Sequence, residues 1–426
     1  MKRLLKIDKL TQDFVKNSFG NIIEWYDFTI YGLFAIQISN AFFPTNSKFI
    51  SLLLVFLTFA VGFVARPVGS LIFGMIGDRK GKHYAVNLSI WFMAIPTTLI
   101  GLLPTYHTIG LLAPLALVAL RILQGISAGG QFSGLITIAV DSEAKNKTFL
   151  VSLVYTVSVI GCFLASFIGY LAIKAVAGIG SEDPMIKSLT WRIPFVLSGL
   201  LFIIYIKLRP EFTKHSLEID NKFSFMDILH KQPRELVSMM VLSASLGSIY
   251  YILFTYLVTY MQLHLYIRKP TAFMTINIIL LFSIVLYPIF GYIAYGYKCR
   301  LKQAQIYIKY LLVSVGIFTC VHFSLWLGLL GLLCVVVCFC AITSFVTSLF
   351  AELFETRFRM TACSFSFNAG VTIAGFAPLI AEIFSKFSIF GLPILMALIC
   401  ITMYLTLNSV IKSVGYKAIP VRHHTK

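Results

Sequence analysis

Between two apolar segments, each long enough to cross a membrane, lies the short polar stretch Gly74-Met75-Ile76-Gly77-Asp78-Arg79-Lys80-Gly81-Lys82-His83. Glycine permits a sharp backbone reversal and a close approach of the flanking helices. An acid followed by several cations supplies charges that can hold neighbouring helix ends together. The alternative is an ordinary cytoplasmic turn, which is usually positively charged. The stretch predicts a conformational latch formed by Gly74, Asp78, Arg79, Gly81 and Lys82.

The composition indicates a membrane protein. Hydrophobic residues make up 58% of the 426 residues, charged residues make up 12%, and the mean hydropathy is +0.87. An ordinary soluble domain is ~25% charged. A membrane-spanning helix needs ~20 apolar residues. Twelve runs of roughly this length occur, at 18–42, 49–75, 84–104, 110–140, 148–172, 191–207, 234–262, 270–295, 304–326, 328–352, 361–384 and 388–411.

The net charge of +18 raises the question of a nucleic-acid partner. Most Lys and Arg residues fall in the N-terminal segment and in alternate loops, as the positive-inside rule describes. We therefore expect both termini to be cytoplasmic and no nucleic acid to bind. The segment Met1–Lys16 is too polar for a signal peptide. The eight cysteines lie in or beside apolar runs, so neither a disulfide framework nor a metal site is expected.

The longest polar interruption, Leu208–Gln232, divides the chain into two halves. It predicts an N-terminal six-helix bundle over 1–207, a cytoplasmic linker over 208–233, and a C-terminal six-helix bundle with a short cytoplasmic tail over 234–426. The segment Gly291–Arg300 repeats the opening glycine and cationic tail of the first loop, but Tyr295 takes the place of the acid. Repeated halves are typical of alternating-access transporters. The second latch is expected to be the weaker one.

Further motifs occur in order along the chain: Gly20–Phe28, Tyr31–Gly32, Phe42–Pro44, Gly62–Gly69, Leu103–Tyr106, Arg121–Gly125, Gly129–Gly130, Trp191–Phe195 and Glu352–Arg359. With the first loop they resemble the metabolite:proton symporter branch of the major facilitator superfamily, which includes bacterial proline/betaine, oxoglutarate, citrate and shikimate transporters. The resemblance covers essentially the whole chain. It implies an all-α membrane protein with twelve transmembrane helices in two pseudo-symmetric six-helix bundles. We assign Arg357 and Arg359 of the last motif to the latch.

Some positions depart from the pattern of this branch. Gln131 stands where Glu usually follows the paired glycines, and Glu355 stands where Pro is usual. Gln131 can form hydrogen bonds but cannot carry a proton, so coupling by an acid at that position is excluded. About fifteen residues follow the last run, so we expect no C-terminal coiled coil of the kind that some osmosensing relatives use.

Two acids in the first run are candidates for proton coupling. Glu24 and Asp27 share one helix face, and Tyr31 follows one turn later. A carboxylate at membrane depth is costly and usually faces a cavity or a partner. Such an acid can bind and release a proton as its exposure alternates. We predict that Asp27 carries the proton and that Glu24 is the second candidate; the alternative is that both acids lie at the interface and fix loops.

Arginines within apolar runs are candidates for substrate binding. Arg121, Gln124 and Gln131 share a face of the fourth run. Arg121 has no acid nearby on its own helix, so its partner must be another helix or a substrate carboxylate. A structural arginine bonded to backbone carbonyls is the alternative. Aromatic rings attract quaternary ammonium groups. The predicted substrate-binding residues are Arg121, Gln124, Gln131, Arg66, Tyr31, Tyr155, Tyr251 and Asn368.

The sequence contains no H-E-x-x-H or phosphate-loop motif, and its one G-x-S-x-G match, Gly125–Gly129, lies within an apolar run and not at a strand-to-helix elbow, so we expect neither an enzyme nor a cofactor. We predict a monomeric secondary transporter of a bacterial inner membrane that imports a small zwitterionic or carboxylate metabolite with protons, with a proline/betaine-type osmolyte favoured. Its expected partners are the substrate, protons and the lipid bilayer. Two alternatives remain: an uncoupled exchanger or uniporter of an organic acid, and a non-transporting sensor on a transporter fold.

Overall fold

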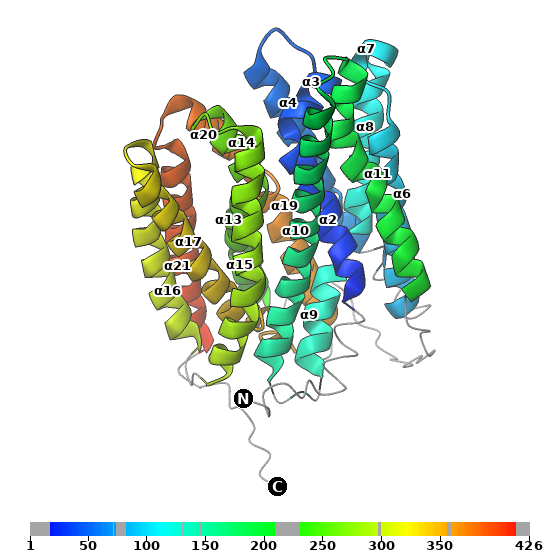
Figure 1. Cartoon of the computed structure of the whole chain (residues 1–426). Helices are drawn as coiled ribbons and strands as arrows, with labels where there is room; N and C mark the ends of the chain where they lie inside the picture. The colour runs from blue at the N-terminus through cyan, green and yellow to red at the C-terminus, as the bar shows by residue number, and fades with distance from the viewer. Residues whose placement is uncertain are drawn as a thin grey trace, which may run out of the picture.

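The computed structural model describes residues 18–70, 72–73, 82–129, 131–142, 144, 146–208, 231–296, 300–355 and 359–414. Within these ranges the regular structure is helical throughout, and Figure 1 shows the helices standing side by side in one bundle. Ten helical segments are long and apolar enough to cross a membrane. The shorter apolar helix Leu88–Leu102 and the pair α2–α3 complete the twelve predicted spans.

The first half of the chain contains α2 (Phe19–Leu33), α3 (Ala35–Phe42), α4 (Lys48–Val64), α6 (Lys82–Leu102), α7 (Tyr106–Ile109), α8 (Leu112–Ser127), α9 (Gln131–Asp141), α10 (Lys147–Ile179) and α11 (Pro184–Leu208). The second half contains α13 (Pro233–Tyr251), the π-helix η1 (Ile252–Tyr256), α14 (Leu257–Leu263), α15 (Lys269–Gly296), α16 (Arg300–Phe318), the 3-10 helix η2 (Thr319–His322), α17 (Leu325–Val346), α18 (Leu349–Glu352), α19 (Arg359–Ala374), α20 (Ala377–Phe387) and α21 (Gly391–Val414). Residues 209–230 lie outside the described ranges, so the predicted linker remains a prediction.

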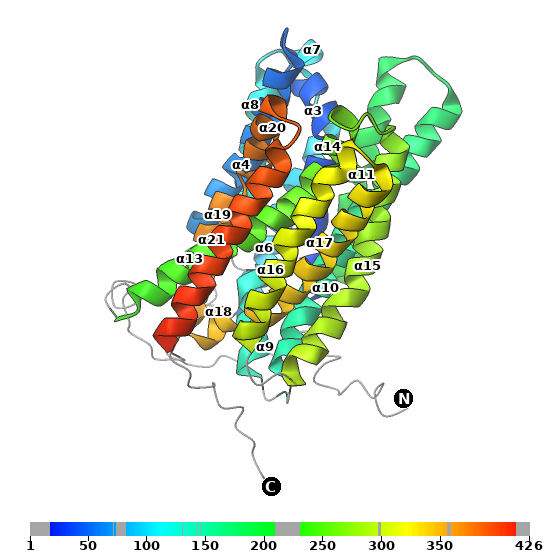
Figure 2. The same cartoon turned by 90° about the vertical axis from the view of Figure 1, so that its left-hand side faces the viewer.

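The two ends of the bundle differ in what they carry. The first described helix begins and the last one ends at the same end, which we call the terminal end (Figure 1). The opposite end, which we call the distal end, carries α7, α14 and α20; the view in Figure 2 shows the same arrangement. Large apolar side chains such as Trp91, Leu115 and Val285 are exposed on the outside of the bundle, as expected of helices that face lipid.

Several spans are interrupted near the middle of the bundle. The fourth predicted span consists of two helices, because α8 ends at Ser127 and α9 begins at Gln131. Gly129 lies in this break, where a Cβ atom would come within 2.3 Å of the Ser70 backbone nitrogen and 2.5 Å of the Arg66 carbonyl oxygen. Only glycine permits so close an approach of two backbones. Interrupted spans expose backbone carbonyls that can serve as hydrogen-bond acceptors inside a membrane protein.

The two halves touch each other at both ends. At the terminal end, Arg359 at the start of α19 donates to Asp141 at the end of α9, over 2.5 Å. At the distal end, the Tyr256 ring of η1 packs edge-on against Phe56 of α4, with 5.7 Å between centroids. A contact at each end thus joins the two halves in this structure.

Candidate functional site

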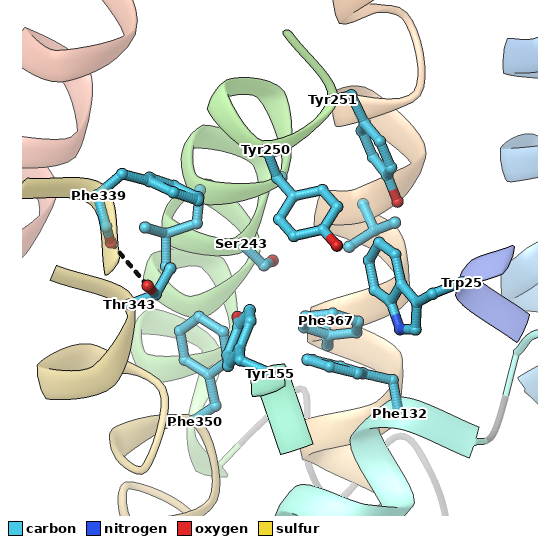
Figure 3. A pocket seen from close by; sticks show the side chains of 13 residues that line it. Trp25, Phe132, Tyr155, Ser243, Tyr250, Tyr251, Phe339, Thr343, Phe350 and Phe367 are labelled. Carbon is cyan, nitrogen blue, oxygen red and sulfur yellow. Dashed lines mark hydrogen bonds between the residues drawn. The ribbon is translucent and has the colours of Figure 1, made fainter. Parts of the chain in front are cut away.

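A small cavity lies between the two halves (Figure 3). Its walls are made mostly of aromatic side chains from both halves, and none of its described lining residues is charged. The hydroxyl-bearing residues Ser243 and Thr343 interrupt the aromatic wall on the side of the second half. The other lining residues are Trp25, Phe132, Tyr155, Leu246, Gly247, Tyr250, Tyr251, Phe339, Phe350, Phe367 and Val371.

The rings around the cavity contact one another across the two halves. The Trp25 ring of α2 lies 4.7 Å from the Tyr250 ring of α13, and the Phe132 ring of α9 lies 4.9 Å from the Phe367 ring of α19. The indole nitrogen of Trp25 is buried and has no hydrogen-bond partner among the described residues. Stacked π-faces attract cations, and an unused N–H offers a ligand one hydrogen-bond donor.

Beside the cavity, a buried ion pair joins α2 and α4. Glu24 Oε1 lies 2.8 Å from Arg66 Nη2, and each side chain is 1% exposed. Arg66 also donates to the Ala128 carbonyl over 3.2 Å and to Asn368 Oδ1 over 3.2 Å. Asn368 in turn donates to the Gly129 carbonyl over 2.6 Å. The break in the fourth span thus supplies two acceptors for this network, which connects both halves.

The second predicted acid, Asp27, has a different environment. Within the described part of the chain it forms no ion pair, and its Oδ2 accepts a hydrogen bond from Thr97 over 2.8 Å. Thr97 accepts from Gln124 over 2.5 Å, and Gln124 accepts from Arg121 over 2.9 Å. The described residues offer no hydrogen-bond partner to Asp27 Oδ1 or to the Nε and Nη2 atoms of Arg121. A neutral relay therefore separates a buried acid from a buried cation, which attract each other electrostatically.

Arg121 lies behind an aromatic layer instead of facing the cavity directly. Its guanidinium lies 4.2 Å from the centroid of the Tyr31 ring and 5.2 Å from that of Phe59. The Tyr251 ring contacts Phe59 at 5.8 Å and also lines the cavity. Tyr31 is thus part of the Arg121 pocket, and Tyr251 connects that pocket to the cavity.

Most predicted latch residues lie outside the described residues. These are Gly74, Asp78, Arg79, Gly81 and Arg357, together with the side chain of Lys82. The side chain of Gln131, a predicted substrate-binding residue, also lies outside the described residues. Arg359 is described, and it pairs with Asp141. In the second repeat, Arg300 donates to Glu352 over 2.9 Å and to Thr148 and Ser348 over 2.7 Å each. The acid missing at position 295 is therefore supplied by another helix, α18.

The structure brings the predicted substrate residues into three separate groups. Tyr155 and Tyr251 line the cavity, and Arg121, Gln124 and Tyr31 form the pocket beside Asp27. Arg66 binds both Glu24 and Asn368. Sequence reasoning missed several important residues. Trp25 lies inside the quoted motif Gly20–Phe28, so that motif was its available signal. Thr97 carries no such signal, because a threonine in an apolar helix is ordinary.

Comparisons with known proteins agree with this architecture. The family model described as Major Facilitator Superfamily matches residues 18–364. The chain is 30% identical over 394 residues to the proline/betaine transporter of Salmonella typhimurium, covering 88% of this chain and 77% of that protein. It is 39% identical over 186 residues to the shikimate transporter of Escherichia coli, covering 43% and 41%. The proton:xylose symporter XylE, solved with 6-bromo-6-deoxy-D-glucose, superposes with a TM-score of 0.77 at 14% identity, over 94% of this chain and 95% of that one.

Proposed function

Because the chain belongs to the major facilitator superfamily of membrane transporters, we propose that it imports a small zwitterion of the proline/betaine type together with a proton. One observation carries the proposal. The first half holds a buried acid, Asp27, and a buried cation, Arg121, and neither has an ion-pair partner among the described residues. Charged groups are retained at such depth mainly for function.

The cavity supports a substrate with a cationic nitrogen. Its wall is aromatic and lacks charged side chains among the described lining residues, so attraction to a quaternary or secondary ammonium comes from the π-faces. The unused indole N–H of Trp25 is a donor for a substrate carboxylate. The likeness to a proline/betaine transporter over most of the chain supports the same class. The shorter likeness to a shikimate transporter makes a hydroxylated carboxylate the second candidate.

Thr97 explains how Asp27 can exist in two protonation states. Its hydroxyl oxygen lies 2.8 Å from Asp27 Oδ2 and 2.9 Å from the Met93 carbonyl, but it has one proton to donate. When Asp27 is ionised, Thr97 donates to the carboxylate. When Asp27 is protonated, its O–H donates to Thr97, and Thr97 turns its own proton to Met93. Gln124 donates to Thr97 in both states, so the relay stays intact.

The relay also connects proton binding to substrate binding. A substrate carboxylate that reaches Nε and Nη2 of Arg121 offsets the positive charge that otherwise attracts Asp27. The charge balance of this half then favours a proton on Asp27, and by linkage a protonated Asp27 favours the substrate. Reaching Arg121 requires the rings of Tyr251 and Phe59 to move aside as the two halves rearrange.

Transport in proteoliposomes tests the proposal. We expect radiolabelled proline or glycine betaine to accumulate when the inside is alkaline, and to exchange without a gradient. Exchange without gradient-driven accumulation would indicate an uncoupled exchanger. Binding without either activity would indicate a sensor. Shikimate, citrate and oxoglutarate added as competitors identify a carboxylate transporter if they inhibit uptake more strongly than proline and betaine do.

We also propose that both termini lie in the cytoplasm of a bacterial cell, that the protein is a monomer, and that the bundles divide at the 208–233 linker. The start of α2 and the end of α21 at the same end of the molecule support the first point (Figure 1). Reporter fusions after Val414 and in the Ser181–Asp183 loop distinguish the two orientations. Light scattering of the purified protein gives its oligomeric state.

A further inference from the structure

A second polar cluster lies at the distal end of the second half. Glu382 of α20 is 3% exposed, and its Oε2 accepts a hydrogen bond from the Tyr256 hydroxyl over 2.8 Å. His264 Nε2 lies 3.4 Å from the same carboxylate oxygen. The His264 side chain is 19% exposed, so the cluster extends from a buried acid to a partly open imidazole. The proposed coupling through Asp27 does not use any of these groups.

A second histidine completes the cluster. The Tyr260 hydroxyl lies 3.0 Å from His322 Nε2, and the Tyr260 ring stacks on His264 with 5.2 Å between centroids. Four elements, η1, α14, η2 and α20, therefore contribute to one continuous group of titratable side chains. We call it the distal cluster; it consists of Tyr256, Tyr260, His264, His322 and Glu382.

The elements packed against the distal cluster carry few charges among the described residues. α15, which packs against α14, begins at Lys269, whose Nζ lies 5.7 Å from the centroid of the Phe34 ring. Lys386, one turn after Glu382, lies 5.7 Å from the centroid of the Phe49 ring on α4, where Lys48 begins the helix. The first two turns of α21, Gly391–Leu398, contain no titratable residue. The titratable residues at the distal end of α13 are Tyr250 and Tyr251, which line the central cavity. The imidazole of His264 is therefore the cationic group in hydrogen-bond range of Glu382.

The distal cluster touches the contact between the two halves. Tyr256 packs its ring on Phe56 of α4 while its hydroxyl binds Glu382. One residue earlier, Thr255 lies so close to Gly32 of α2 that a Cβ atom on the glycine would come within 1.8 Å of the Thr255 methyl group. Tyr256 also belongs to η1, a π-helical segment, and such segments often mark functional sites. Separation of the halves at this end would pull Tyr256 away from one of its two partners.

We propose that Glu382 and His264 form a second proton-binding site, and that the bound proton holds the distal end closed. With the proton on His264, an imidazolium offsets the buried carboxylate. Without it, the buried carboxylate keeps the Tyr256 hydroxyl and the neutral imidazole as hydrogen-bond partners but loses its counter-charge. A buried charge without a counter-charge is strongly destabilising. Hydration of Glu382 through separation of the distal ends relieves that cost. Histidine is the side chain that ordinarily titrates near neutral pH.

Pulsed electron paramagnetic resonance tests this inference without any substrate. Spin labels are attached through non-canonical residues at Asn46, in the connection between α3 and α4, and at Ser388, directly after α20; both residues are exposed and they belong to opposite halves. We expect the ratio of long to short distances to rise several-fold from pH ~5.5 to pH ~8.5, because the imidazole that faces Glu382 is of the type that ordinarily loses its proton in this range. Glu382→Gln and His264→Gln should each remove this pH response.

The matched control is Glu182→Gln, which makes the same chemical change at an exposed acid of the same end. It should keep the full response. No response in the unmodified protein, or a full response in either distal-cluster variant, would overturn the inference. His264→Gln alone decides the matter if Glu382→Gln does not fold, because both residues are needed for the site. The distances between the spin labels are measured without substrate and do not depend on transport. A negative result would therefore not contradict the proposed proton coupling through Asp27.

Discussion

Glu24 and Asp27 lie three residues apart on α2, and both are buried, yet their surroundings differ. Glu24 is bound by Arg66 at 2.8 Å, and that arginine continues to Ala128 and Asn368. Asp27 has the hydroxyl of Thr97 as its partner. A proton on Glu24 would break an ion pair and leave Arg66 buried without its counter-charge. A proton on Asp27 breaks no ion pair, so the same helix carries one structural acid and one acid suited to coupling.

The largest effect is expected from Asp27→Asn. The amide preserves shape but cannot take up a proton, so accumulation driven by a proton gradient should be lost completely. Exchange of proline or betaine should persist, because it needs no net proton movement. Gradient-driven uptake and counterflow are measured in the same liposomes. Full accumulation by this variant would remove Asp27 from the coupling role, and loss of both activities would assign it to substrate binding or structure.

Glu24→Gln should reveal the structural acid by its effect on stability. Removing one partner of a buried ion pair costs ~3–5 kcal/mol, because Arg66 keeps its charge in a site that is 1% exposed. The expected result is a large drop in the thermal midpoint of the purified protein. The double variant Glu24→Gln with Arg66→Gln should recover part of this loss, since no unpaired charge remains. A midpoint equal to that of the unmodified protein would make the comparison between the two acids wrong.

Arg121→Lys tests whether the cation beside Asp27 binds the substrate. A point charge replaces a planar fork that can hold a carboxylate through two parallel bonds. The affinity for proline or betaine should fall by about 10- to 100-fold, which corresponds to ~1.4–2.7 kcal/mol. Calorimetry on the purified variant measures the dissociation constant. Unchanged affinity would exclude Arg121 from the substrate site. The charge of Arg121 would then act on Asp27 and not on the substrate.

Thr97→Val tests the relay itself. Valine keeps the shape of threonine but removes the hydroxyl that joins Asp27 to Gln124. Leaving these buried polar groups without a partner costs ~1–3 kcal/mol, so coupled uptake should fall about tenfold while counterflow changes less. Thr97→Ser restores the hydroxyl and should restore uptake. If serine fails to rescue, the side chain matters for packing and the relay plays no part in coupling.

The arrangement of spans could be predicted from local properties of the sequence. Hydropathy and length identify apolar runs, and the glycine-rich loop at 74–83 indicates the family. The break in the fourth span was not predicted, although the paired glycines Gly129 and Gly130 were noticed. The reason for the break is tertiary: Gly129 packs directly on the backbone of Arg66 and Ser70. The helix propensity of a segment does not indicate which other helix will pack against it.

The candidate site was harder to predict because its parts meet only in three dimensions. Arg121 was expected to need a partner from elsewhere, and the structure places it behind Tyr31 and Phe59. Thr97 lies 70 positions from Asp27, and no spacing rule connects them. The sequence contains 38 Phe and 20 Tyr residues, and most of them pack in the core or face lipid. Nothing in the sequence distinguishes the rings that line the cavity from these others. Charged residues in apolar runs were thus informative by themselves, whereas neutral polar and aromatic partners were not.

The smallest effect is expected at the terminal end, where a partly exposed pair shows what burial adds to the Glu24–Arg66 pair. Arg359 pairs with Asp141 over 2.5 Å, but the Asp141 side chain is 53% exposed. Solvent screens such a pair, so its contribution is ~0–1 kcal/mol. Asp141→Asn should therefore leave the thermal midpoint nearly unchanged, in contrast to Glu24→Gln. It should change the exchange rate of proline or betaine by no more than about fivefold, through easier separation of the halves at this end.

Counterflow at several salt concentrations measures this effect, because high salt should make the unmodified protein resemble the variant. A stability loss as large as that of Glu24→Gln would mean that the pair is shielded from water by residues around it, and that exposure alone does not separate the two kinds of pair.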